Sequence, residues 1–147
     1  MQLINKATVQ QKIDALKDQN VYIHLEMTTG AYASHHDSSK HPAANFITNA
    51  VIRYSQGTIA GNGPYRVGLR MSQGWVYSEG LTHWDETQTE TLLLAGHDTQ
   101  GKLVVSLQIS REPSRRRGVI LWNNAFLLYC RIRMTKLSVC PERWPST

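Results

Sequence analysis

The sequence predicts a mainly β fold at the border with α+β. We expect a small antiparallel barrel, or a curled sheet or sandwich, of seven to eight short strands with one N-terminal helix. Two observations predict this fold. Apolar and polar residues alternate with a period of two in several short segments, and turn residues recur roughly every eight to twelve residues between them. At 147 residues the chain has the size of one domain.

One helix is expected at Thr8–Gln19. Thr8 is a suitable N-cap, and Gln11 three residues later completes a capping-box pattern. An apolar stripe recurs at helical spacing, formed by Val9, Ile13 and Leu16. Because only one side is apolar, the helix should lie against a sheet.

The first strand is expected in "VYIHLEMT", where the period changes from about 3.6 to 2. The buried face would carry Val21, Ile23, Leu25 and Met27. The solvent face would carry Tyr22, His24, Glu26 and Thr28. This pattern is typical of a half-buried strand.

Further strands are expected along the rest of the chain up to Pro113. In order they are "AYASHH", the long strand "FITNAVIRYS" that "QG" ends, "TIAGNG", "YRVGLRM", "WVYSEGL", and a last hairpin of "TLLLAGH" and "KLVVSLQIS" around "DTQG". Polar loops are expected at "DSSKHPAAN" and "DETQTE".

Charge is unevenly distributed. Residues 1–110 hold eight Lys or Arg and nine Asp or Glu, a balance of −1, whereas residues 111–147 hold eight and two, a balance of +6. The body therefore lacks the electropositive groove that nucleic-acid binding requires, and its many aromatic residues are interpreted as core or interface residues. We expect neither nucleic acid nor membrane as a partner of the body.

We divide the chain into a β domain, residues 1–113, and an atypical basic tail, residues 114–147. The tail holds both cysteines, Cys130 and Cys140, which are interpreted as free thiols. Its segment "VILWNNAFLLYCRIRM" is too short and too interrupted to span a bilayer. The tail could lie on a membrane surface, pack as an extra element or be disordered. The interpretation we favour is translation in a shifted reading frame, and any nucleic-acid or membrane-surface function would depend on this tail.

No secretory signal is recognised at the N-terminus, because "MQLINKATVQQK" has no apolar run behind its first lysine. No uninterrupted apolar stretch reaches the roughly 18 residues of a membrane-spanning helix. A cytoplasmic location is therefore expected.

The stretch "GNGPYRVGLR" resembles a phosphate-binding loop at first sight. The spacing fails the dinucleotide fingerprint, because Arg66 stands at the third glycine position, and no Gly-Lys-Ser/Thr follows. Gly61 and Gly63 are therefore predicted to form a tight turn or a bulge, at which positive φ is needed. Contact of this turn and Arg66 with an anion is the alternative.

His24 and Glu26 are the first candidates for a site, because residues two apart on a strand share a face and a carboxylate can orient an imidazole. The alternative is two polar residues on the solvent face.

The other histidines predict no metal site. His35, His36 and His41 lie in or beside one polar loop with no metal-ligand spacing. His97 at a strand end is interpreted as structural, with a site role as the alternative. No nucleophile motif such as G-x-S-x-G occurs, and the first cysteine is Cys130. The sequence therefore favours a protein that is not an enzyme. No cofactor is expected.

The segments "VYIHLEMTTGAY", "GNGPYRVGL", "GWVYSEGLT" and "GKLVVSLQIS" resemble the YojF family of small bacterial proteins of unassigned function. The resemblance covers roughly residues 5–112. It implies a compact, mainly β protein with a helix near its start, whose gene tends to lie beside that of an LmbE-like deacetylase of bacillithiol synthesis. It assigns no catalytic residues.

Two functions follow as hypotheses. The first is a non-catalytic accessory or binding protein, with the LmbE-like deacetylase as its partner; it predicts an exposed apolar patch. The alternative is a small-ligand-binding protein or enzyme. Its candidate residues are His24, Glu26, Arg66, Glu79 and His97. A homodimer paired through edge strands is also expected.

Overall fold

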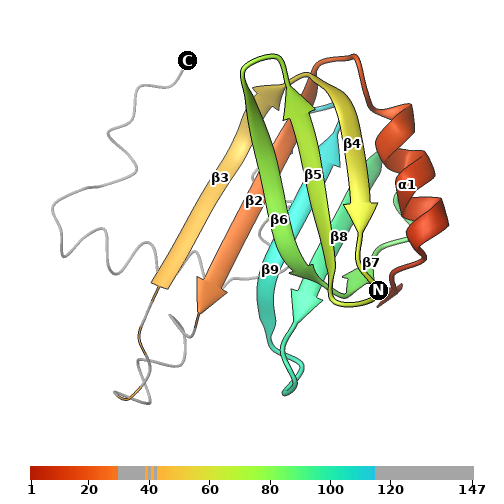
Figure 1. The fold of residues 1–147 in the computed structure, drawn as a ribbon. Coiled ribbons are helices and arrows are strands. Elements are labelled where there is room, and N and C mark those ends of the chain that lie inside the picture. The colour runs from red at the N-terminus through yellow and green to blue at the C-terminus, as the bar shows by residue number, and fades with distance from the viewer. Residues whose placement is uncertain (30–38, 40, 42, 115–147) are drawn as a thin grey trace, which may run out of the picture. The chain divides into compact units, whose positions relative to one another are not determined.

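The computed structural model describes residues 1–29, 39, 41 and 43–114 (Figure 1). The expected strand "AYASHH" and residues 115–147 of the tail lie outside the described residues. Along the described chain the elements are β1 (Gln2–Leu3), α1 (Lys6–Ala15), β2 (Val21–Thr29), β3 (Ala43–Ile52), β4 (Tyr54–Ala60), β5 (Tyr65–Met71), β6 (Gly74–Leu81), β7 (His83–Trp84), β8 (Thr91–His97) and β9 (Leu103–Ser110).

The described strands form two antiparallel sheets. The larger has the order β1-β7-β8-β9-β2-β3, and the smaller has the order β4-β5-β6. Of the expected architectures, the sandwich is confirmed, and the strands of the described residues do not close into a barrel. Two strands were not predicted from the sequence, β1 and β7; each has only two residues, too few to display an alternating pattern.

The helix begins earlier than predicted. Asn5, not Thr8, is the N-cap: the Asn5 side chain accepts a hydrogen bond of 3.1 Å from the backbone N–H of Thr8. Asn is at least as good an N-cap as Thr. An N-cap side chain accepts a hydrogen bond from the backbone N–H two or three residues later, and Thr8 lies three residues after Asn5. Val9 and Ile13 are completely buried, as the apolar stripe predicted. No helix in the described part of the chain is long and apolar enough to cross a membrane.

The core lies between the two sheets and α1. In the larger sheet it is built by alternate residues of neighbouring strands, since Ile23 pairs with Ile109, and Ile109 pairs with Leu92. The completely buried side chains include Tyr54, Ile13, Leu69, Leu81, Leu92, Leu94, Leu107, Ile109, Val9, Val21 and Val67. These come from both sheets and the helix, so the three layers share one apolar cluster.

The expected long strand "FITNAVIRYS" is two strands. β3 ends at Ile52 and β4 begins at Tyr54, and the two belong to different sheets. The chain changes layer here because the Tyr54 side chain turns into the core and donates a hydrogen bond of 2.6 Å from its hydroxyl to the Ile13 carbonyl oxygen. Nor does "QG" end a strand, since Gly57 lies within β4. A Cβ at Gly57 would collide with the Ile13 side chain, so glycine lets the strand approach the helix closely.

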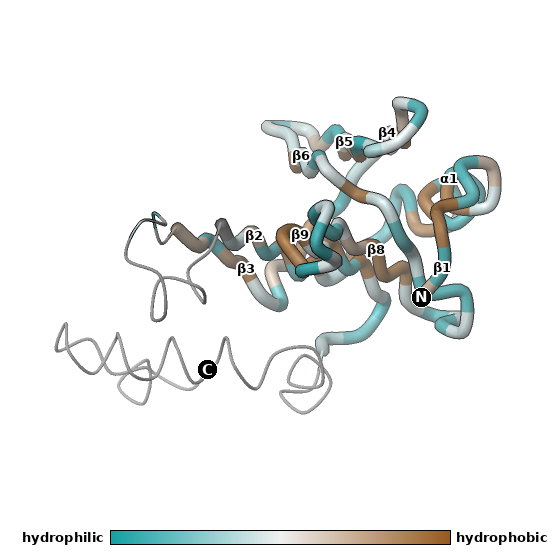
Figure 2. The backbone as a smooth tube through the Cα atoms, turned by 90° about the horizontal axis from the view of Figure 1, so that it is seen from below, coloured by the Kyte–Doolittle hydropathy of each residue, from teal (hydrophilic) through white to brown (hydrophobic). Residues whose placement is uncertain are grey.

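The smaller sheet covers only part of the larger one. Figure 1 and Figure 2 show β6 beside β9 and β8, while β2 and β3 extend beyond the β6 edge. We call these two strands, Val21–Thr29 and Ala43–Ile52, the β2–β3 wing. Within the described residues, no strand pairs with the outer edge of β3.

Candidate functional site

The five candidate site residues lie in three groups and do not share one pocket. His24 and Glu26 lie on β2. Arg66 and Glu79 face each other on β5 and β6. His97 ends β8.

His24 and Glu26 form a buried pair. The Nε2 atom of His24 lies 3.2 Å from Oε2 of Glu26. The residues are only 7% and 8% exposed, so the expectation that both lie on a solvent face is wrong. Among the residues that the structure describes, neither His24 Nδ1 nor Glu26 Oε1 has a hydrogen-bond partner. Buried polar atoms without a partner are costly, and they need a structural or functional explanation.

A β-bulge lies directly beside this pair. Ile23 pairs with Ala50 and Leu25 pairs with Ile47, so two residues of β3, Thr48 and Asn49, stand opposite His24 alone. Asn49 has a φ of 53°, a conformation that asparagine tolerates better than most residues. Such bulges bend a strand and re-aim side chains, and here the bulge lies opposite the histidine.

Arg66 and Glu79 belong to a polar and aromatic group on the outer face of the smaller sheet. The Tyr77 hydroxyl donates a hydrogen bond of 2.8 Å to Glu79 Oε2, and this bond raises the pKa of Tyr77. The Arg70 guanidinium lies 5.9 Å from the ring centroid of Trp75 on the neighbouring strand. Trp75 is 67% exposed, so this aromatic residue belongs to the surface and not to the core.

His97 lies against His83, a residue for which the sequence gave no signal. Their Nδ1 atoms are 3.2 Å apart, and the rings meet edge to face with centroids 4.8 Å apart. The Thr82 hydroxyl oxygen lies 2.7 Å from His83 Nδ1 and accepts a hydrogen bond of 3.2 Å from the backbone N–H of His97. His97 is therefore part of a cluster, which only the pairing of β7 with β8 reveals.

Two glycines make this cluster possible. After β6 the chain crosses into the larger sheet, and the Thr82 backbone N–H donates to the Ala95 carbonyl oxygen at 2.9 Å. At the crossing, the Gly80 carbonyl oxygen lies so close to Gly96 that a Cβ there would collide with it. A register shift between Gly96 and His97 then moves the imidazole towards His83.

Burial lowers the pKa of His97, and the neighbouring His83 lowers it further, while Asp98 acts in the opposite direction. Its surroundings therefore favour the neutral form of the His97 ring. No group of three or more His, Cys, Asp or Glu side chains gathers as a metal cluster in residues 1–29, 39, 41 and 43–114.

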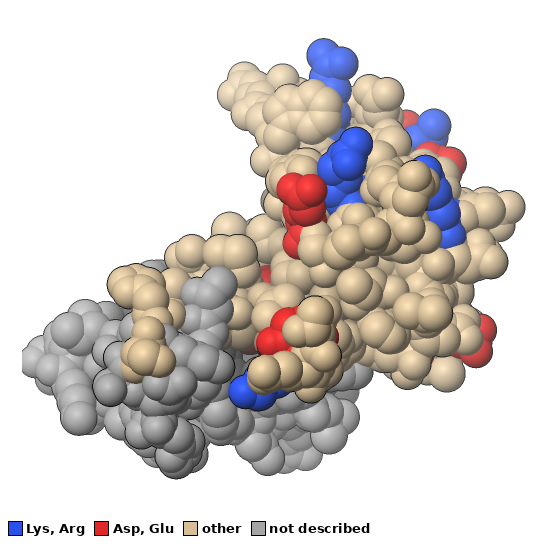
Figure 3. All heavy atoms as spheres, turned by 60° about the horizontal axis from the view of Figure 1, so that its bottom comes forward, with Lys and Arg blue, Asp and Glu red and all other residues tan. Residues whose placement is uncertain are grey.

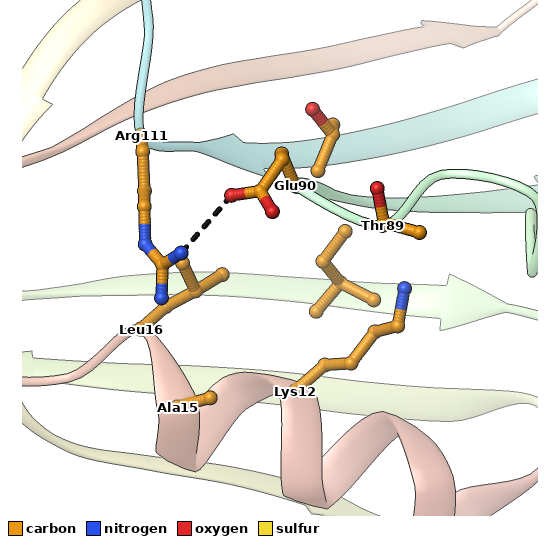
Figure 4. Close-up of a pocket in the computed structure, with 8 residues that line it drawn as sticks. Lys12, Ala15, Leu16, Thr89, Glu90 and Arg111 are labelled. Atoms are coloured by element: carbon orange, nitrogen blue, oxygen red, sulfur yellow. Dashed lines mark hydrogen bonds and ion pairs between the residues drawn. The ribbon is translucent and has the colours of Figure 1, made fainter.

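A small hollow lies between the end of α1 and the start of β8 (Figure 4). Its charged side chains are occupied within the chain. Arg111 pairs with Glu90 at 3.0 Å and donates to Gln19, while Lys12 donates to the Gln88 carbonyl oxygen. These contacts tie the helix to the sheet, and we interpret the hollow as structural.

The turn at Gly61 and Gly63 is confirmed. Their φ angles are 102° and 100°, a region that favours glycine, and the turn joins β4 to β5. The Gly61 carbonyl oxygen accepts a hydrogen bond of 3.2 Å from Lys6.

The β2–β3 wing carries an apolar surface. Met27 and Ile47 are 44% and 51% exposed on the core-bearing face, and Phe46 and Val51 are 41% and 56% exposed on the opposite face. The ten residues of β3 include no charged side chain. In Figure 3 few charged side chains lie at the left of the view, where the visible described surface is almost entirely tan.

Comparisons with known proteins identify the family of this chain. Residues 3–114 match the family model described as "Protein of unknown function (DUF1806)". The chain belongs to this family. It is 47% identical over 113 residues to the uncharacterised protein YojF of Bacillus subtilis strain 168. The aligned residues cover 77% of this chain and 97% of YojF. The crystal structure of B. subtilis YojF superposes with a TM-score of 0.64 at 45% identity, covering 77% of this chain and 95% of that one. The resemblance seen in the sequence is thus confirmed.

Proposed function

We propose that this DUF1806 protein is a non-catalytic accessory protein that binds a partner protein through the β2–β3 wing. The observation that carries the proposal is the exposed, uncharged apolar surface of Met27, Ile47 and Val51 at one end of the larger sheet.

The edge position of β3 supports binding at the wing. Soluble proteins protect long edge strands with charged residues, proline or a covering element, because an open edge pairs with other chains. The described part of β3, Ala43–Ile52, contains neither a charged residue nor proline. An edge of this composition is typical of a strand that is covered in the working assembly.

Both faces of the wing contribute. Met27 and Ile47 are apolar on the side of the smaller sheet, and Val51 is apolar on the other. A partner seated at this end of the sheet would contact both faces at once, and burial of the exposed apolar side chains would supply affinity.

The partner we propose is the LmbE-like deacetylase that the family resemblance implies. The charge balance of the body is near zero and β3 carries no charged residue, so the contact would depend on apolar burial rather than on steering by charge. Association should therefore depend little on salt concentration.

Size-exclusion chromatography with light scattering tests this proposal on the full chain, alone and mixed with the deacetylase. We expect a stoichiometric complex that persists when the salt concentration is raised. Two independent peaks would contradict the proposed partner, and a dimer of this chain alone would assign the wing to self-association instead.

Matched variants locate the contact. Ile47→Arg places a charge on the wing, and Thr58→Arg places the same charge at an exposed position of β4. We expect Ile47→Arg to abolish the complex and Thr58→Arg to leave it intact, with both variants melting at temperatures near that of the wild type. Loss of the complex in both variants, or in neither, would contradict binding at the wing.

A second candidate function is a small-ligand site at His24 and Glu26, favoured by their partnerless buried atoms. When His24 Nε2–H donates to the carboxylate, both Nδ1 and Glu26 Oε1 remain as acceptors. The ligand would then offer N–H or O–H donors, as an amine or a polyol does.

Nitrogen NMR of the His24 ring, with ethanolamine and glycerol as probes, tests this second function. A saturable shift that Glu26→Gln weakens is expected for a ligand site. The same spectrum at every probe concentration would contradict it.

A further inference from the structure

We propose that Thr82, His83 and His97 form a binding site for a divalent transition-metal ion such as Zn²⁺. The site is independent of the wing and of the His24–Glu26 pair, and it would add a metal-dependent property to a protein whose sequence shows no metal motif.

The spacing of the two imidazoles fits one ion. Metal–nitrogen bonds to Zn²⁺ are about 2.0–2.1 Å long, so two ligands separated by 90–110° at the metal lie roughly 2.9–3.4 Å apart. The Nδ1 atoms of His83 and His97 are 3.2 Å apart, within this range. Imidazole nitrogen is a preferred ligand of zinc, copper and nickel.

The Thr82 hydroxyl supplies a third polar atom at the same place. Its oxygen lies 2.7 Å from His83 Nδ1 and 3.2 Å from the backbone nitrogen of His97. It could coordinate directly or hold a metal-bound water. The two imidazoles would be the main ligands, with the remaining positions open to the hydroxyl and to water.

The scaffold holds the donors in place before any ion arrives. His83 pairs with Ala95 in the β7–β8 ladder, and the Thr82 backbone N–H is bound to the Ala95 carbonyl oxygen. The close contact of Gly80 with Gly96 fixes the crossing of the chain beside His97. Ligands on paired strands are positioned more tightly than ligands on loops.

Binding would change the tautomer of one imidazole ring. Without metal, the short Nδ1–Nδ1 contact requires one ring to donate a hydrogen to the other. Coordination uses both Nδ1 lone pairs, so this hydrogen moves to Nε2 of its own ring.

The test is calorimetric titration of the full chain with zinc chloride. Because His35, His36 and His41 offer other imidazoles, the titration is repeated with these three replaced by glutamine. In that background we expect one ion per chain, and an affinity at least tenfold lower after His83→Gln or His97→Gln. Thr82→Ser, which keeps the hydroxyl, should bind more tightly than Thr82→Val.

Nitrogen NMR of the imidazoles in the same background keeps the test independent of variant folding. Zinc should shift the Nδ1 resonances of His83 and His97 and leave those of His24 in place. Absence of binding in this background, binding that His83→Gln and His97→Gln do not change, or zinc shifts at His24 alone would overturn the proposal.

Discussion

The two halves of the larger sheet both carry apolar residues on the same face, but these residues lie in different environments. In β8 and β9, Leu94 and Leu107 are completely buried beneath the smaller sheet. In the wing, Met27 and Ile47 lie on the same face of the same sheet and are 44% and 51% exposed. The alternating pattern predicts which side of a strand is apolar, but burial also requires a second layer, and the described layer stops short of the wing.

This difference indicates that the buried and the exposed apolar residues of the larger sheet have different roles. Apolar residues beneath the smaller sheet stabilise the fold by their removal from water, at roughly 25 cal/mol per Å². The exposed apolar residues of the wing, such as Met27 and Ile47, contribute little of that stabilisation in the isolated chain. We infer that they serve binding, and the following predictions test the comparison.

The largest effect is expected from truncation beneath the smaller sheet. Leu107→Ala should lower the free energy of unfolding by about 2–5 kcal/mol, because it removes transfer free energy and leaves a cavity. Ile47→Ala, the matched truncation in the wing, should cost well under about 1 kcal/mol. Urea unfolding measures both, and equal losses would contradict the distinction between the two halves.

Gly96→Ala is expected to have the next largest effect. The added methyl group would collide with the Gly80 carbonyl oxygen and with Val105, so the crossing from β6 to β7 must shift. We expect a loss of about 1–3 kcal/mol, typical of overpacking. Gly101→Ala, where nothing lies within 4 Å of the added Cβ but φ is 76°, separates this collision from backbone strain. A larger loss at Gly101 would contradict the role of the close contact.

Tyr54→Phe should destabilise by about 1 kcal/mol, because it removes the buried hydrogen bond to the Ile13 carbonyl oxygen and keeps the ring. Burial of this hydroxyl raises the pKa of Tyr54, and the nearby Asp14 adds to the shift. Thermal unfolding at neutral pH measures the loss. An unchanged melting temperature would mean that the bond does not hold β4 to α1.

The smallest effect is expected when the pH is lowered and His97 is protonated. The pKa of His97 is lower in the folded protein than its ordinary value of 6.5, so the unfolded chain binds the proton more readily. The free energy of unfolding should therefore be highest above about pH 6.5, and it should decrease as the pH falls towards the pKa of His97 in the folded protein. His97→Gln should make the unfolding free energy less dependent on pH between roughly 7 and 5. Identical slopes in urea titrations of both proteins would contradict this.

Much of the fold was predictable from local pattern. The hairpin of β8 and β9, the strands β5 and β6, and the body of the helix follow the periods of the sequence. The N-cap was missed because Asn5 and Thr8 are both good caps, and only the geometry decides between them.

The sites were less predictable, because they depend on pairing between distant strands. His83 lies in a two-residue strand and meets His97 only through the β7–β8 ladder. The pairing of Arg66 with Glu79 likewise depends on register. His24 and Glu26 were expected to share a face, and they do, but their burial could not be seen in an alternating pattern.

Hydrogen exchange of the β3 backbone amides tests the central claim, that the wing is a binding surface, most directly. The full chain is compared alone and with the deacetylase. We predict that the backbone amides of β3 exchange more slowly in the mixture. The amides of β5, a strand of the smaller sheet outside the proposed contact, should keep their exchange rates. Unchanged exchange in β3 while a complex forms would place the contact elsewhere and contradict the account.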